Sequence, residues 1–168
     1  MNTIDEINFL DPFYATVRHE SRQLLEMLDE TVFEQGEQFV GFDQLTAISP
    51  WLAGGLAQLL AERGSSVLLV NHPSLKAITK SMLGVEALGA VSFIDDGNPK
   101  EDFTEEGFIR KCRAADVIIG NFSCENNYGL DSQYLSSEQH EEGAKLLSEG
   151  MATLANKANP NARVICFV

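Results

Sequence analysis

The chain has 168 residues, and its 25 acidic and 12 basic side chains give a formal net charge of −13 at pH 7. This excess of negative charge argues against binding to nucleic acid or to an anionic membrane, because the phosphates of both would repel it. The length and the 44% hydrophobic content are typical of one soluble globular domain, and neither a spanning segment nor a secretory signal is expected, so we predict a cytoplasmic protein.

The first predicted element is an amphipathic helix of about residues 12 to 32. Asp11 can cap it, and Pro12 suits its first position. Val17, Leu24 and Leu28 recur near helical spacing, which predicts one apolar face. That face packs either on the chain's own domain or on another subunit.

From residue 37 onward, apolar strands alternate with helices. Ser49 and Pro50 predict the start of a helix over about 50–63, and Gly64 predicts its end. Alternation of this kind predicts an α/β fold with a parallel sheet of about five strands, covered by helices on both faces. We expect the strand order 3-2-1-4-5. The predicted strands are QFVGFDQL, SSVLLVN, GAVSFID, ADVIIGNF and RVICFV, and the further helices are SLKAITKSMLG, PKEDFTEEGFIRKCR and residues 136–157.

The stretch TAISPWLAGGLAQLLAERGSSVLLVN carries a family resemblance. Over about residues 39–168 the order and spacing resemble the N-terminal half of short-chain dehydrogenases/reductases, which are NAD(P)-dependent enzymes with a Rossmann fold. Thr46 and Gly64 fit the family's opening motif T-G-x-x-x-G-x-G and its following helix. With the helical pattern before it, this predicts an N-terminal helical extension over 1–36 and a Rossmann-like domain over 37–168.

The three glycines of that motif are replaced here by Ala47, Trp51 and Ala53. Glycine permits the tight turn and lets the backbone approach the pyrophosphate, so the phosphate loop is expected to be closed. Trp51 is interpreted as a plug or a packing aromatic, with a stacking surface for a ring as the alternative. The helix start at Ser49 could still attract an anion weakly.

Further positions match the family's cofactor cleft only in part. Asn71 ends the second strand, where NAD sites commonly place an acid on the ribose. Asp95 corresponds to the aspartate beside the adenine pocket, and Asn121 matches an asparagine of the family stretch D-V-L-V-N-N-A-G. The vestigial cleft predicted from the resemblance therefore comprises Thr46, Ser49, Trp51, Asn71, Asp95 and Asn121.

The catalytic residues of the family are missing from the sequence. Leu147 stands at the position of the family's proton-relay asparagine, and no Tyr-x-x-x-Lys occurs. Without that tyrosine and lysine we expect no hydride transfer by this chain alone. No cofactor is expected, and NAD(P) only if another chain completes an oxidoreductase. The phosphate loop of ATPases is also absent.

Other chemistries have weaker support. Cys112, Cys124 and Cys166 lie far apart and are read as reduced thiols. The histidines are too scattered to predict a metal site. Cys124 and His72 each follow a predicted strand, which leaves a nucleophile–base pair as a remote candidate.

The leading hypothesis from the sequence is a non-catalytic partner or structural subunit that binds an intact homologous reductase or a second copy of itself. The alternatives are the nucleotide-binding part of an NAD(P)-dependent oxidoreductase completed by another chain, and a small-molecule sensor.

Overall fold

The computed structural model describes residues 12–30, 37–40, 49–71, 75–85, 87–94, 96, 104–121 and 137–167. Its centre is a parallel sheet whose neighbouring strands are β5 (Arg163–Phe167), β4 (Val117–Asn121), β2 (Val67–Val70) and β3 (Val91–Phe93). The short strand β1 (Glu37–Val40) pairs with β5 at the edge, and the order reads β1-β5-β4-β2-β3. The predicted α/β class with a parallel sheet is confirmed.

The predicted strand order 3-2-1-4-5 is wrong. The first strand lies at the edge beside β5, and β2 pairs directly with β4, with Val70 opposite Gly120. A central parallel strand is buried on both faces and needs a continuous apolar run. VLLV and VIIGN provide such runs, whereas two of the four residues of β1, Glu37 and Gln38, are polar. The edge position therefore suits β1 better.

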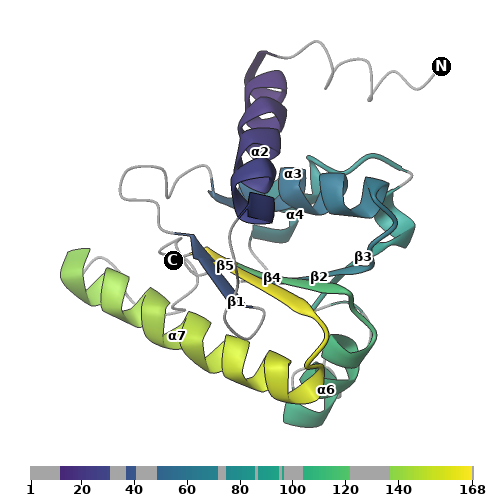
Figure 1. Ribbon diagram of the computed structural model, residues 1–168. Helices are drawn as coiled ribbons and strands as arrows, with labels where there is room; N and C mark the ends of the chain where they lie inside the picture. Colours follow the sequence, from purple (N-terminus) through teal and green to yellow (C-terminus); the bar gives the residue numbers. More distant parts are fainter. Residues whose placement is uncertain are drawn as a thin grey trace.

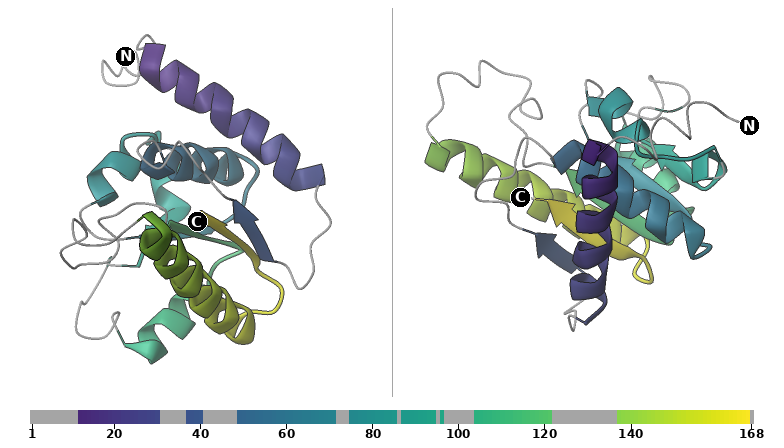
Figure 2. Two further views of the ribbon diagram at one scale, coloured as in Figure 1. Left: turned by 90° about the vertical axis from the view of Figure 1, so that its left-hand side faces the viewer. Right: turned by 90° about the horizontal axis from the view of Figure 1, so that it is seen from above.

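Helices cover both faces of the sheet, as Figure 1 shows and Figure 2 repeats from two other sides. One face carries α2 (Pro12–Glu30), α3 (Ser49–Glu62), the single turn α4 (Lys76–Lys80) and the 3₁₀ turn η3 (Ala87–Gly89). The other face carries α6 (Glu105–Arg113) and α7 (Ser137–Ala158). No helix in the described part of the chain is long and apolar enough to cross a membrane.

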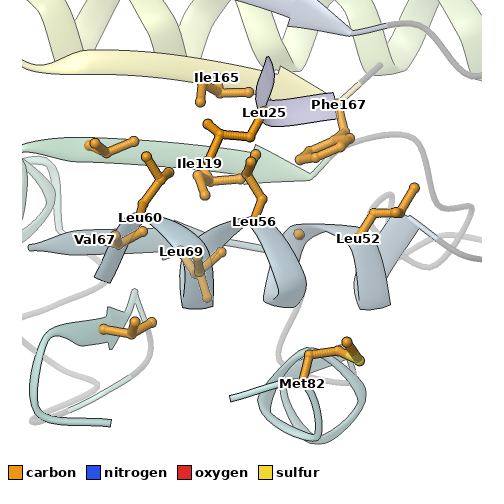
Figure 3. Packing of buried hydrophobic residues seen from close by; sticks show 14 of the residues in the cluster. Leu25, Leu52, Leu56, Leu60, Val67, Leu69, Met82, Ile119, Ile165 and Phe167 are labelled. Atoms are coloured by element: carbon orange, nitrogen blue, oxygen red, sulfur yellow. The ribbon is translucent and has the colours of Figure 1, made fainter. Parts of the chain in front are cut away.

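The larger core lies under α3. Leu52, Leu56 and Leu60 recur every fourth residue and point from α3 toward the sheet, where they meet side chains such as Ile119 and Phe167 (Figure 3). Fully burying each of these leucines contributes roughly 1.5–3 kcal/mol to stability. The helix ends at Gly64, whose φ of +89° is the left-handed conformation expected of a glycine cap. The predicted end of this helix is thereby confirmed.

Two glycines let other helices approach α3 closely. A Cβ on Gly54 would lie 2.2 Å from the carbonyl oxygen of Thr79, and a Cβ on Gly55 would lie 2.2 Å from Oγ of Ser21. Neither distance is possible for a real side chain. Glycine at 54 and 55 therefore permits the packing of the segment after β2 and of α2 against α3.

The N-terminal helix α2 belongs to the same core. Its buried residues Val17, Ser21, Leu25 and Leu28 form one face, and Leu25 lies in the cluster with Ile119, Ile165 and Phe167 (Figure 3). The sequence allowed this helix to pack either on the chain's own domain or on another subunit. In the structure its apolar face packs on the chain's own domain.

Asp29 joins the end of α2 to two other elements. Its carboxylate accepts hydrogen bonds from Arg63 at 2.8 Å and from Arg163 at 2.9 Å. Partial burial alone would raise the pKa of Asp29, but the two guanidinium groups outweigh it and lower this pKa below the usual value.

Replacing Asp29 by asparagine should remove part of the acid sensitivity of folding. Because the pKa of Asp29 is lower in the folded state, its ionisation stabilises the fold above about pH 4, and this contribution is lost as the pH falls through the folded-state pKa. The pairs are partly exposed, so we expect a loss of less than about 1 kcal/mol at pH 7. Urea unfolding of Asp29→Asn and wild type between pH 3 and 7 measures this difference, with Glu30→Gln as the control. A constant difference across that range would contradict the prediction.

Candidate functional site

The candidate site lies at the carboxyl ends of β2 and β4. These strands are neighbours, but the chain leaves β2 toward β3 and leaves β4 toward β5, on opposite sides. Such a reversal is the place where open α/β sheets commonly bind ligands, because the two connections separate there. Three of the predicted cleft residues gather at this point: Asn71 directly follows β2, Asn121 ends β4, and Ser49 begins α3.

Ser49 and Asn121 are in direct contact. The hydroxyl of Ser49 donates a hydrogen bond of 3.2 Å to Oδ1 of Asn121, and both side chains are buried. The bond fixes the first residue of α3 against the last residue of β4. A buried polar pair of this kind is costly to break, so it holds the helix start in place.

Asn71 is also used within the fold. Its side-chain amide donates to the hydroxyl of Thr79 at 3.1 Å, and both residues are buried. This bond connects the end of β2 to α4. Asn71 therefore stabilises the fold at the position where the family resemblance implies contact with a ribose.

Trp51 packs against the N-terminal helix. Its ring is half-buried beside the larger core and meets Phe13 of α2 edge to face, with the ring centroids 5.3 Å apart. Phe13 in turn contacts Tyr14 in a second edge-to-face pair. The indole therefore fills the junction of α2 and α3, which agrees with its interpretation as a packing aromatic.

Shortening Phe13 should expose Trp51, which is the only tryptophan of the chain. In Phe13→Ala we expect the emission maximum to move to longer wavelength, acrylamide quenching to increase and stability to fall by roughly 1 kcal/mol. Met27→Ala, an exposed position near the other end of α2, should leave all three unchanged. An unaltered spectrum in Phe13→Ala would mean that the two rings do not pack in solution.

Beside β3 the structure reveals a cluster that the sequence reasoning missed. Lys76 forms an ion pair with Asp96, while the ammonium of Lys111 donates to the carbonyl oxygens of Phe93, Ile94 and Asp96. Partial burial alone would raise the pKa of Asp96, but hydrogen bonds from Lys76 and from the Phe93 amide lower it overall. The sequence did contain a signal for this ion pair. Lys76 begins the helix after β2 and Asp96 follows β3, and these two strands are neighbours in the sheet.

The thiols in the described part of the chain offer no nucleophile. Cys112 and Cys166 are buried thiols that form no disulfide with each other, and burial raises the pKa of Cys112 to about 11, which keeps it protonated at neutral pH. Within the described ranges, no group of three or more His, Cys, Asp and Glu side chains could hold a metal ion. Thr46, Asp95, His72 and Cys124 lie outside the described residues.

What the site can do follows from the side chains that it presents. Ser49, Asn71, Thr79 and Asn121 are neutral hydrogen-bonding groups that hold secondary-structure elements together. Groups of this kind can orient a polar ligand, but they do not exchange protons near neutral pH.

Comparisons with known proteins add no family to this picture. No protein-family model matches the chain, and no curated protein matches its sequence. The function of the site is therefore inferred from its own geometry.

Proposed function

We propose that this chain is a non-catalytic Rossmann-like protein that acts as a partner or structural subunit by binding another protein. One observation carries the proposal: the described polar residues of the predicted cofactor cleft are engaged inside the fold. Ser49 is bonded to Asn121, and Asn71 is bonded to Thr79. A cofactor entering here would have to compete with these internal bonds. The proposal includes a cytoplasmic location.

The order of the strands and the packing of Trp51 support the same proposal. In a dinucleotide site of the predicted type, the first strand would lie between β2 and β4 and lead directly into the phosphate-binding turn. Here β2 and β4 are paired with each other, and the first strand lies at the edge. In addition, Trp51 is packed under α2. The place of a cofactor is thus occupied by contacts between the protein's own elements. This suits a protein that functions by binding a partner with its surface.

Titration with NADH and NADPH tests the proposal. We expect no saturable binding below about 1 mM by calorimetry, and no energy transfer from Trp51 to the nicotinamide. Ser49→Ala serves as the matched variant, because it opens the bond to Asn121 without adding bulk. Sub-millimolar binding to the wild type, weakened in Ser49→Ala, would overturn the proposal and favour the alternative of a nucleotide-binding part completed by another chain.

A second candidate, a small-molecule sensor, is favoured by the strand order. The reversal between β2 and β4 is where α/β proteins bind small molecules, and neutral amides surround it here. A thermal-shift screen of nucleosides, nucleotides and other polar metabolites tests this role, because a ligand that binds only the folded state raises its melting temperature. A hit whose effect disappears in Asn71→Ala would favour the sensor over the protein-binding role.

A further inference from the structure

The outer side of α7 carries an apolar stripe that nothing in the described structure covers. Leu146, Leu147 and Leu154 are 69%, 43% and 37% exposed, and Gly150 lies between them with nothing within 4 Å of the position that a Cβ would take. We call these four residues the α7 stripe. Leu146, Gly150 and Leu154 are spaced by four and therefore lie on one side of the helix.

The stripe lies on the side of α7 that faces away from the core. The opposite side of α7 buries Ser148, Met151, Ala152 and Ala155 against the sheet and α6. The other exposed large apolar residues of the described structure form smaller groups: Phe13 and Met27 lie near opposite ends of α2, and Val85 and Leu88 lie just before and within η3. Single exposed apolar side chains are ordinary, whereas three leucines along one helix face are typical of an interaction surface.

Two leucines of the stripe are placed symmetrically about Gly150, whereas Leu147 is mirrored by Thr153. Leu146 precedes it by four residues and Leu154 follows it by four. If two copies of α7 lie antiparallel with Gly150 at their crossing, Leu146 of each copy meets Leu154 of the other. Glycine at the crossing lets the helix backbones approach closely, and a twofold axis requires such reciprocal contacts.

Charges at the two ends of the stripe have the same symmetry. Glu142 and Lys157 are exposed and lie eight residues before and seven residues after Gly150. The antiparallel arrangement brings Glu142 of one copy near Lys157 of the other, twice per pair. A parallel arrangement would bring like charges together instead. This complementarity matters because the chain as a whole carries −13 and its copies repel each other at long range.

We propose that the α7 stripe is a homodimer interface in which a second copy of this chain packs antiparallel across Gly150. The inference rests on the proposed function and selects, from the two partners expected, the second copy rather than a reductase subunit. α7 has 22 residues, and one helix per subunit makes a small interface. We therefore expect reversible association with a Kd on the order of 10 µM.

Sedimentation velocity of the full chain over a range of concentrations tests the proposal. We expect a monomer–dimer equilibrium that Leu146→Glu weakens at least about a hundredfold, because each dimer loses two buried leucine contacts. Met27→Glu is the matched control, since it places the same charge on an exposed apolar position of another helix. Circular dichroism verifies that both variants are folded.

A charge exchange tests the antiparallel register. Glu142→Lys and Lys157→Glu should each weaken dimerisation about tenfold, and the double variant should restore it, because the pair is re-formed in the opposite sense. A dimer that is indifferent to Leu146→Glu, or a double variant as weak as the single variants, would overturn the α7 interface. A wild type that stays monomeric up to about 500 µM would overturn the second copy as the partner. Neither result changes the outcome expected from the titration with NADH and NADPH. That titration tests the proposed function, so its failure can be told apart from failure of the dimer proposal.

Discussion

Replacing Gly54 by alanine is expected to destabilise the protein by about 1–3 kcal/mol, although alanine is the better helix former. The added Cβ would lie 2.2 Å from the carbonyl oxygen of Thr79 and 3.0 Å from Cβ of Met82. Both are atoms of the backbone or next to it, so neither can move away by a side-chain rotation. The segment following β2 would have to shift away from α3.

Two opposing effects determine the sign of this prediction. Alanine in place of glycine in a helix interior gains about 1 kcal/mol from the lower entropy of the unfolded chain and the better helix propensity. Separating packed elements in a close-packed core typically costs more than that gain. Gly55→Ala should be less damaging, because its nearest obstacle is the hydroxyl of Ser21, which can rotate away, and only Cβ of Ser21 at 3.0 Å is fixed.

Urea unfolding of a three-member series measures the effect. Gly84→Ala is the control, since its Cβ would lie 3.6 Å from Oε1 of Gln58, an ordinary contact. We expect the stability order Gly84→Ala, Gly55→Ala, Gly54→Ala, from the highest to the lowest. If Gly54→Ala were as stable as Gly84→Ala, α3 and the segment after β2 would have to lie farther apart than in the structure.

Most elements could be predicted from the sequence because their signals are local. The helix at 12–30 follows from the spacing of its apolar residues, and the end of α3 follows from Gly64. The strands VLLV and VIIGN are continuous apolar runs, which is typical of buried parallel strands. Signals of this kind depend only on neighbouring residues.

The order of the strands could not be predicted in the same way, because it depends on competition between distant segments. The βαβ pattern around 37–71 fits a first strand next to β2 as well as a first strand at the edge. The local warning was the polarity of the first strand, with Glu37 and Gln38 in β1. That warning argued against a central position, but it did not say which segment would take the centre.

The site was predictable as a set of residues but not as a set of contacts. Asn71, Asn121 and Ser49 do meet at the carboxyl edge, because helix starts and strand ends of an α/β unit lie there. Their hydrogen-bond partners depend on side-chain geometry, which a sequence does not give. Similarly, the role of Gly54 and Gly55 in helix packing appears only when the distances to Thr79 and Ser21 are known.

Replacing Asn121 by aspartate is expected to destabilise the protein by about 3–5 kcal/mol at pH 8, because it places a negative charge in the interior at the end of β4. Asn121 is 1% exposed, and its Oδ1 accepts a hydrogen bond from the neutral hydroxyl of Ser49. The substitution preserves size and shape almost unchanged, so packing should contribute little to the loss. The effect therefore reports the electrostatic environment at the end of β4.

The pH dependence of Asn121→Asp separates this cause from a packing defect. Burial raises the pKa of a carboxyl group in the folded state above the value of about 3.9 in the unfolded chain. The folded variant then holds its proton at a pH where the unfolded chain has lost it, so the variant loses stability as the pH rises above about 4. We expect its difference from wild type to be small at pH 4 and to grow toward pH 8, as measured by urea unfolding. Asn161→Asp, an exposed position, should show little difference at either pH. A loss of equal size at pH 4 and pH 8 would instead indicate a packing or hydrogen-bonding defect. Little loss at either pH would show that the end of β4 is open to water, as expected for an accessible ligand cleft rather than for the closed site that we propose.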